Sequence, residues 1–175
     1  MKDIKGKTVL VLDDEPDIRL YLETILTNAG FEVMLASNGK EALQKLKKRT
    51  PDVISLDLVM PKTSGLQFFL HLQKTKDKSK IPIVVVSAHG KDEFGKKYLE
   101  KLMEEPRKCE LFYLEKPVNP AVYLVAIRKA LGLPARKKQT EEKAVMSRVK
   151  DMINMADKDK LEKVMKILEV KGRGK

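Results

Sequence analysis

Short, nearly continuous apolar runs constrain the fold of this 175-residue chain more than any other feature. Four such runs cover residues 8–12, 53–56, 83–86 and 111–114. A strand with one face in water alternates apolar and polar residues, whereas a strand buried on both faces has no need to alternate. Each run therefore predicts a strand inside a parallel sheet that is covered on both faces.

Helical patterns separate these runs, with apolar residues recurring every three or four positions. A fifth run, residues 31–35, contains a glutamate and predicts an edge strand. Within the last helical pattern we expect Val122, Val125, Ala126 and Ala130 to face inward. Five strands that alternate with five helices predict an α/β fold with right-handed crossovers. The helical patterns cover residues 18–29, 38–50, 64–72, 91–104 and 119–130.

The alternating pattern stops at Gly132, which we interpret as the end of a domain of residues 1–132. The extension, residues 133–175, carries two amphipathic patterns joined by a short turn, which predicts a helical hairpin. The extension holds four of the eight methionines of the chain, a residue type that suits adaptable interfaces. Two interpretations stay open: the apolar stripes of the two patterns pack within this chain, or they meet a dimer partner or another protein.

The net charge of +11 is denser in the extension than elsewhere. Residues 133–175 hold 13 basic and 7 acidic residues, against 23 and 18 in residues 1–132. A basic extension can contact nucleic acid, but its mixed signs favour a solvated helix surface. The single cysteine and the lack of a signal-peptide pattern predict a cytoplasmic location. No apolar run is long enough to span a membrane, so no membrane partner is expected.

Polar side chains follow four of the apolar runs: Asp13 and Asp14, then Asp57, Ser87 and, one residue further on, Lys116. The carboxyl ends of parallel strands meet at one edge of a sheet, where ligands bind. Three carboxylates that meet there repel one another and favour a divalent cation with oxygen ligands, such as Mg²⁺. The Lys116 ammonium and the Ser87 hydroxyl add groups that suit a phosphoryl group, and Asp57 is the natural nucleophile.

Several of these motifs together resemble the receiver domain of two-component response regulators. The resemblance covers about residues 5–131, and the stretch Asp57-x-x-Met60-Pro61-x-x-x-Gly65 is its most specific part. It implies a flavodoxin-like, doubly wound, five-stranded parallel sheet with strand order 2-1-3-4-5. The motifs are residues 9–16, residues 51–61 with Gly65, residues 86–89 and residues 115–117.

The resemblance also implies a metal-dependent role for the carboxylates. Asp57 would accept a phosphoryl group from the phosphohistidine of a histidine kinase. Asp14 and Asp57 would bind Mg²⁺ directly, together with the backbone carbonyl of Val59. Asp13 would act mainly through a metal-bound water. Mg²⁺ is thus the cofactor that the sequence predicts.

Other residues of the motifs would sense and regulate the phosphoryl group. Ser87 and Lys116 would contact its oxygens, and the bond between Lys116 and Pro117 would be a cis peptide. Tyr113 matches the aromatic switch position of the family, and its ring would turn inward when Ser87 moves toward the phosphoryl group. The side chains of Val59 and His89 would set the lifetime of the phosphorylated state.

The sequence therefore predicts a regulatory phosphoacceptor and not an enzyme, with catalysis limited to its own aspartyl-phosphate. The implied partners are a histidine kinase or phosphotransfer protein, an unidentified downstream protein and a second copy of the chain. A nucleic-acid-binding regulator that uses the basic extension is the less favoured alternative. A flavin-binding relative is disfavoured because residues 13–16 would repel phosphate. A haloacid-dehalogenase-type phosphatase would need an aspartate where Val59 stands.

Overall fold

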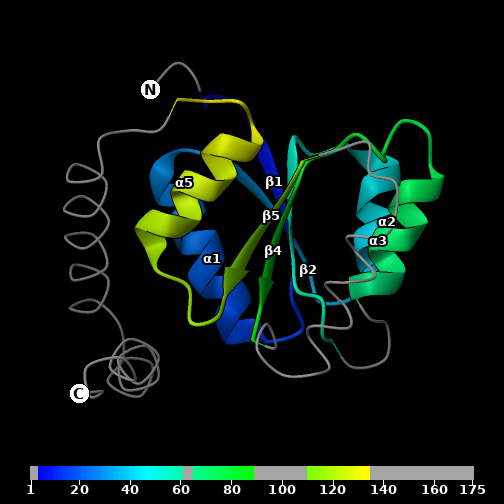
Figure 1. Cartoon of the computed structure of the whole chain (residues 1–175), viewed down its shortest axis with the longest axis horizontal. Helices are drawn as coiled ribbons and strands as arrows, with labels where there is room; N and C mark the ends of the chain where they lie inside the picture. Colours follow the sequence, from blue (N-terminus) through cyan, green and yellow to red (C-terminus); the bar gives the residue numbers. More distant parts are fainter. Residues whose placement is uncertain (1–3, 61–64, 89–109, 135–175) are drawn as a thin grey trace.

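Five parallel strands form one sheet in the order β2-β1-β3-β4-β5 (Figure 1). The computed structural model describes residues 4–60, 65–88 and 110–134. The strand order and the edge position of β2 are as predicted. The strands are β1 (Thr8–Leu12), β2 (Glu32–Ala36), β3 (Val53–Leu56), β4 (Ile83–Ser87) and β5 (Leu111–Glu115).

Helices cover both faces of the sheet (Figure 1). Alternate residues of β1 point to opposite sides: Val9 and Val11 pack with α1 and α5, and Leu10 and Leu12 pack with α2 and α3. Because both faces are buried, no strand position in the centre of the sheet requires a polar residue, which explains the continuous apolar runs. The helices are α1 (Pro16–Ala29), α2 (Gly39–Lys48), α3 (Gly65–Lys74) and α5 (Pro120–Ala130).

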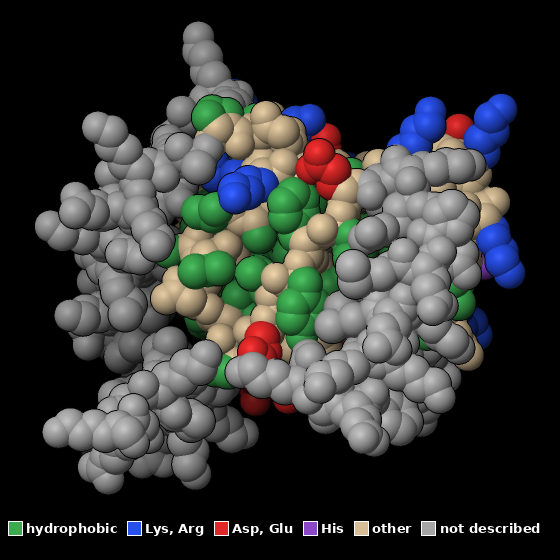
Figure 2. All heavy atoms as spheres, in the orientation of Figure 1, with side chains coloured by type: hydrophobic (Ala, Val, Ile, Leu, Met, Phe, Trp, Pro, Cys, Tyr) green, Lys and Arg blue, Asp and Glu red, His purple; other side chains and the backbone are tan. Residues whose placement is uncertain are grey.

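The edge strand β5 is less buried than the three central strands. All five of its residues are half-buried, and hydrophobic side chains are visible in the centre of Figure 2, where β5 lies in Figure 1. Residues 89–109 lead into this strand and lie outside the described residues. The same holds for the helix predicted over residues 91–104.

Helix α5 corrects one prediction. Val122 is 44% exposed, so the expectation that it faces inward is wrong, although Ala126 is buried as expected. The side chains that fill the space against the sheet are Tyr123, Leu124 and Ile127. Nearly every position of this helix is apolar, so the sequence period does not single out one stripe. The larger side chains occupy the buried positions.

Side chains and a glycine close the helix ends where the sequence suggests. Gly30 adopts a φ of 97° after α1, a left-handed conformation that other residues rarely adopt. Asn38 accepts a hydrogen bond from the N–H of Glu41 at the start of α2. Asn119 accepts from the N–H groups of Ala121 and Val122 at the start of α5. These caps satisfy N–H groups that have no partner inside the helix.

The C-terminal part of the described chain ends shortly after α5. Gly132 follows the helix, and the chain is described up to Pro134. The domain boundary after Gly132 and the helical hairpin stay predictions, because residues 135–175 lie outside the described residues. Among the helices that are described, none combines the length and apolar character of a membrane span.

Gly65 lets helix α3 approach the end of β3 more closely than any side chain would allow. A Cβ atom at this position would lie 1.8 Å from the carbonyl oxygen of Asp57 and 2.8 Å from the Cα of Leu58. The N–H of Gly65 also donates to the carbonyl of Leu58 at 3.1 Å. The backbone that carries Asp57 is therefore held directly against the first residue of α3.

We expect Gly65→Ala to lower the free energy of unfolding by about 3 kcal/mol or more, because two backbone segments must separate. Gly132→Ala is the matched control: its Cβ would meet nothing within 4 Å, although its φ is +65°. The left-handed conformation alone should cost that control about 1 kcal/mol. Urea denaturation of both variants measures the difference, and equal losses would contradict this account of Gly65.

Candidate functional site

Three candidate site residues follow their strands directly and extend the sheet by one hydrogen bond each. The N–H of Asp13 donates to the carbonyl of the last residue of β2 at 3.2 Å. The N–H of Asp57 donates to the carbonyl of the last residue of β1 at 2.9 Å. The N–H of Lys116 donates to the carbonyl of Ser87 at the end of β4, at 3.0 Å. The sheet itself therefore fixes where these side chains start.

The ammonium group of Lys116 joins the two buried carboxylates. Its Nζ lies 2.8 Å from Oδ2 of Asp13 and 2.7 Å from Oδ2 of Asp57. Glu15 approaches the same nitrogen at 3.3 Å from the solvent side. The Lys116 side chain is only 9% exposed, so these contacts form in a region where water screens charges weakly.

The second oxygen of each buried carboxylate is also engaged. Oδ1 of Asp13 accepts from the N–H of Glu15, and Oδ1 of Asp57 accepts from the N–H of Val59, each at 3.0 Å. Each carboxylate is thus held by Lys116 on one side and by the backbone on the other. Such preorganisation costs no rearrangement when charge develops at the site.

Burial raises the pKa of Asp13 to about 6, against the opposing effect of the nearby Lys116. Burial also raises the pKa of Asp57, again with Lys116 opposing it. Burial acts to lower the pKa of Lys116, but the charges of Asp57 and Asp13 outweigh burial and raise it. One ammonium group therefore compensates the carboxylates only in part, and the site favours a further cation.

Asp14 completes a group of three carboxylates that fits Mg²⁺. One oxygen each of Asp13, Asp14 and Asp57 lies within 4.8 Å of the others. Mg²⁺ takes oxygen ligands at about 2.1 Å, so two ligands on opposite sides of one ion are about 4.2 Å apart. Small side-chain rotations would satisfy this distance, and the donor atoms are the hard oxygens that Mg²⁺ prefers.

Arg19 is a site residue that the sequence analysis missed. Its Nη1 donates to the backbone carbonyls of both Asp13 and Asp14, each at 2.8 Å. The guanidinium group thereby holds the loop that carries these two carboxylates. A basic residue one turn into the helix after an acidic pair was the available signal, but contacts to backbone carbonyls leave no distinct sequence pattern.

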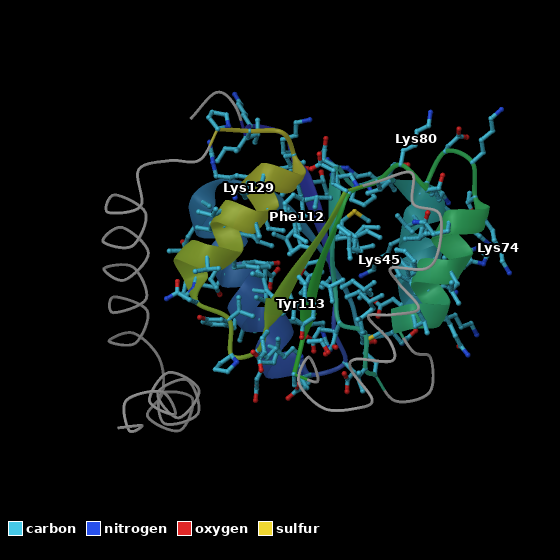
Figure 3. The ribbon with its side chains drawn as sticks, in the orientation of Figure 1. Lys45, Lys74, Lys80, Phe112, Tyr113 and Lys129 are labelled. Carbon is cyan, nitrogen blue, oxygen red and sulfur yellow. The ribbon has the colours of Figure 1, made fainter. Side chains whose placement is uncertain are left out.

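The remaining predicted residues lie around this centre. Ser87 is buried at the end of β4, and Tyr113 is half-buried on β5 against the core under α2 and α3 (Figure 3). Val59 is half-buried against the same core. The peptide bond between Lys116 and Pro117 is cis, and His89 lies outside the described residues.

The sequence of this chain is similar to a known family and to several known proteins. A family model described as the response regulator receiver domain matches residues 9–128. The "Chemotaxis protein CheY" of Thermotoga maritima is 32% identical over 125 residues, which cover 71% of this chain and 97% of that protein. The "Probable transcriptional regulator ycf27" of Pyropia yezoensis is 45% identical over 90 residues, which cover 51% of this chain. The matched segment spans only 35% of that regulator's length.

One solved structure and one further sequence relative give the same comparison. The chemotaxis protein CheY4 of Vibrio cholerae has a TM-score of 0.62 and 29% sequence identity, and the match covers 71% of this chain and 98% of that one. The "Phosphate regulon transcriptional regulatory protein PhoB" of Pseudomonas aeruginosa is 31% identical over 126 residues, 72% of this chain and 52% of that protein. The family match includes every candidate site residue from Asp13 to Pro117.

The raised pKa of Asp13 predicts how stability changes with pH in EDTA. The folded pKa is about 6 and the ordinary value is 3.8, so between them the folded chain binds more protons than the unfolded chain. Rising pH then favours unfolding. Relative to an Asp13→Asn variant, the free energy of unfolding of the parent should fall by at most about 3 kcal/mol between pH 4 and pH 7. Urea denaturation across this pH range measures the loss, and a gain with rising pH would contradict it.

Proposed function

The chain belongs to the response regulator receiver family, and from this premise we propose that Asp57 accepts a phosphoryl group from a phosphohistidine. The donor is a histidine kinase or a phosphotransfer protein. The observation that carries this proposal is the contact of 2.7 Å between the Asp57 carboxylate and the buried Lys116 ammonium. An acceptor carboxylate beside a fixed cation, at the ligand-binding edge of the sheet, suits phosphoryl transfer.

The transfer forms one bond and breaks one. An oxygen of Asp57 attacks phosphorus, the bond between phosphorus and the histidine nitrogen breaks, and that nitrogen keeps the electron pair. Lys116 neutralises charge on the phosphoryl oxygens during the transfer, and the Ser87 hydroxyl donates a hydrogen bond to them. The backbone N–H of Val59 holds the acceptor carboxylate in place.

We propose that Asp14, Asp57 and the backbone carbonyl of Val59 hold Mg²⁺ directly. Both oxygens of Asp13 already have partners, Lys116 on one side and the N–H of Glu15 on the other. The oxygens of Asp57 are engaged in the same way, so the indirect role proposed for Asp13, through a metal-bound water, rests on the resemblance to the family. When bound, Mg²⁺ supplies positive charge that offsets the phosphoryl oxygens.

Two residues on neighbouring strands form the proposed switch. Tyr113 lies opposite Val85 in the register of β4 and β5, and Ser87 follows two residues later on β4. A displacement of Ser87 toward the phosphoryl group would leave space that the half-buried ring of Tyr113 can enter. The surface around β5 would then change shape, and a small free-energy bias suffices to change which partner binds.

The output of this switch is proposed to be an unidentified downstream protein or a second copy of the chain. Two relatives, ycf27 and PhoB, are named as transcriptional regulators, and both proteins extend well beyond the matched segment. The alternative of nucleic-acid binding through the basic extension falls on residues outside the described part of the chain. It stays a prediction, as does the cytoplasmic location.

Incubation with acetyl phosphate and Mg²⁺ should add one phosphoryl group, seen as an increase in intact mass. Asp57→Asn should abolish the addition, and omission of Mg²⁺ should reduce it strongly. Asp77→Asn is the matched control, because Asp77 is an exposed aspartate in the segment after α3, away from the site. Labelling that persists in Asp57→Asn would rule out the assigned acceptor.

Val59→Asn should shorten the lifetime of the phosphorylated state by about tenfold. An apolar side chain cannot orient an attacking water, whereas an amide can, and full proton-transfer catalysis would give about 10²-fold. Val59→Ala provides an apolar control that should decay at nearly the parent rate. Loss of the phosphoryl group is followed by intact mass after removal of acetyl phosphate, and equal decay in all three proteins would reject the role of Val59.

A further inference from the structure

The positive charge of the folded domain is concentrated on one side, in α2, α3 and the segment after α3. Residues 39–49 and 65–80 hold nine of the 23 basic residues of the domain and only two of its 18 acidic residues. The rest of residues 1–132 holds 14 basic and 16 acidic residues. Figure 2 shows Lys and Arg side chains gathered along the outer margin of this helical layer. The extension is therefore not the only basic region of the chain.

Six lysines form what we call the basic face. None of the six forms an ion pair within the part of the chain that the structure describes, in contrast to Lys45 and Arg49, which pair with Glu41 and Glu32. Five of them are exposed, and one is half-buried. Lysine ammonium groups without an ion-pair partner repel one another. A binding partner of opposite charge would reduce this repulsion. The basic face comprises Lys47, Lys48, Lys74, Lys76, Lys78 and Lys80.

The segment after α3 is anchored in a way that presents its lysines outward. Ser79 and Ile81 are buried, and the N–H of Ser79 donates to the carbonyl of Thr75 at 2.9 Å. The lysines at 78 and 80 alternate with these buried residues. In Figure 3, Lys74 on α3 and Lys80 on the segment after α3 both point away from the sheet. The charges are thus placed by ordered backbone.

The basic face and the carboxylate site lie at opposite ends of the strands. The segment of residues 75–82 precedes β4, so it lies at the edge of the sheet where strands begin. Asp57 and its neighbours follow the strands, at the other edge. A partner on the basic face would leave the phosphoacceptor open to a kinase.

We propose that the basic face binds duplex nucleic acid through its phosphate backbone, without reading the base sequence. Phosphate contacts are made mainly by Lys and Arg. Protein interfaces are instead depleted of lysine and have an apolar centre. Within the described residues the exposed large hydrophobic side chains are Leu20 and Val122, which belong to α1 and α5. The basic face therefore lacks both the centre of a protein interface and the apolar groups that insert into a membrane.

Neither the net charge of the extension nor the same face of a second copy complements the basic face. The extension carries 13 basic and 7 acidic residues, so it would be repelled by the basic face. A second copy that met this surface with its own basic face would bring the same charge to the contact. Charge complementarity thus points to an external polyanion, and a duplex, with one negative charge per about 1.7 Å of its axis, has the required density.

The test measures binding of the full chain to a fluorescein-labelled DNA duplex of about 20 base pairs and arbitrary sequence. Fluorescence anisotropy is recorded between about 50 and 200 mM salt. If all six lysines contact phosphates, affinity should fall about 10³-fold over this range. A variant with Lys47, Lys48, Lys76 and Lys80 changed to Gln should bind at least tenfold more weakly at the lowest salt, and with a shallower salt dependence.

A matched variant carries four Gln substitutions in the extension, at Lys137, Lys138, Lys143 and Lys150, and has the same net charge. Its affinity for the duplex at the lowest salt should fall by less than threefold. Both variants should still be labelled by acetyl phosphate, which separates this proposal from that for Asp57. Equal or greater loss in the extension variant would overturn the proposal. So would parent protein that fails to bind the duplex at about 50 mM salt, or that binds only vesicles containing phosphatidylserine.

Discussion

The ammonium group of Lys116 is the charge on which the arrangement of the site depends. It stands after β5 and reaches carboxylates that follow β1 and β3, so it links one edge of the sheet to its centre. Buried carboxylates without a partner would be costly, and removing one partner of such a pair leaves the other charge uncompensated. The strand order matters for the same reason, because it places the two carboxylates side by side and Lys116 within reach.

The α/β class was predictable because burial leaves a direct trace in the sequence, whereas the strand order followed from the resemblance to the receiver family. Strands covered on both faces need no polar positions, and the polar residues that follow them mark the edge where a ligand binds. The centre of α5 was not predictable in the same way, because its residues are nearly all apolar and only packing decides that Tyr123 faces in and Val122 faces out. Arg19 escaped notice because it binds backbone carbonyls, which every residue has.

The basic face illustrates a different limit. A division of the chain at Gly132 shows an excess of positive charge in the extension, but it averages the domain over all its elements. The concentration appears only when α2 and α3 are seen side by side in space. The helix dipoles stabilise this placement of charge, because basic residues occupy the negative C-terminal turns of α2 and α3 while the acidic pair stands beside the positive N-terminus of α1.

The contact between Gly65 and Asp57 has a mechanical consequence. Most contacts in a protein core pass through side chains, which can change rotamer and absorb a small displacement. Here backbone meets backbone, and no rotamer is available to yield. Protein interiors are also nearly incompressible. Movement of the main chain at Asp57 is therefore transmitted to α3, which moves as a rigid body. Lys74, at the far end of this helix, moves with it.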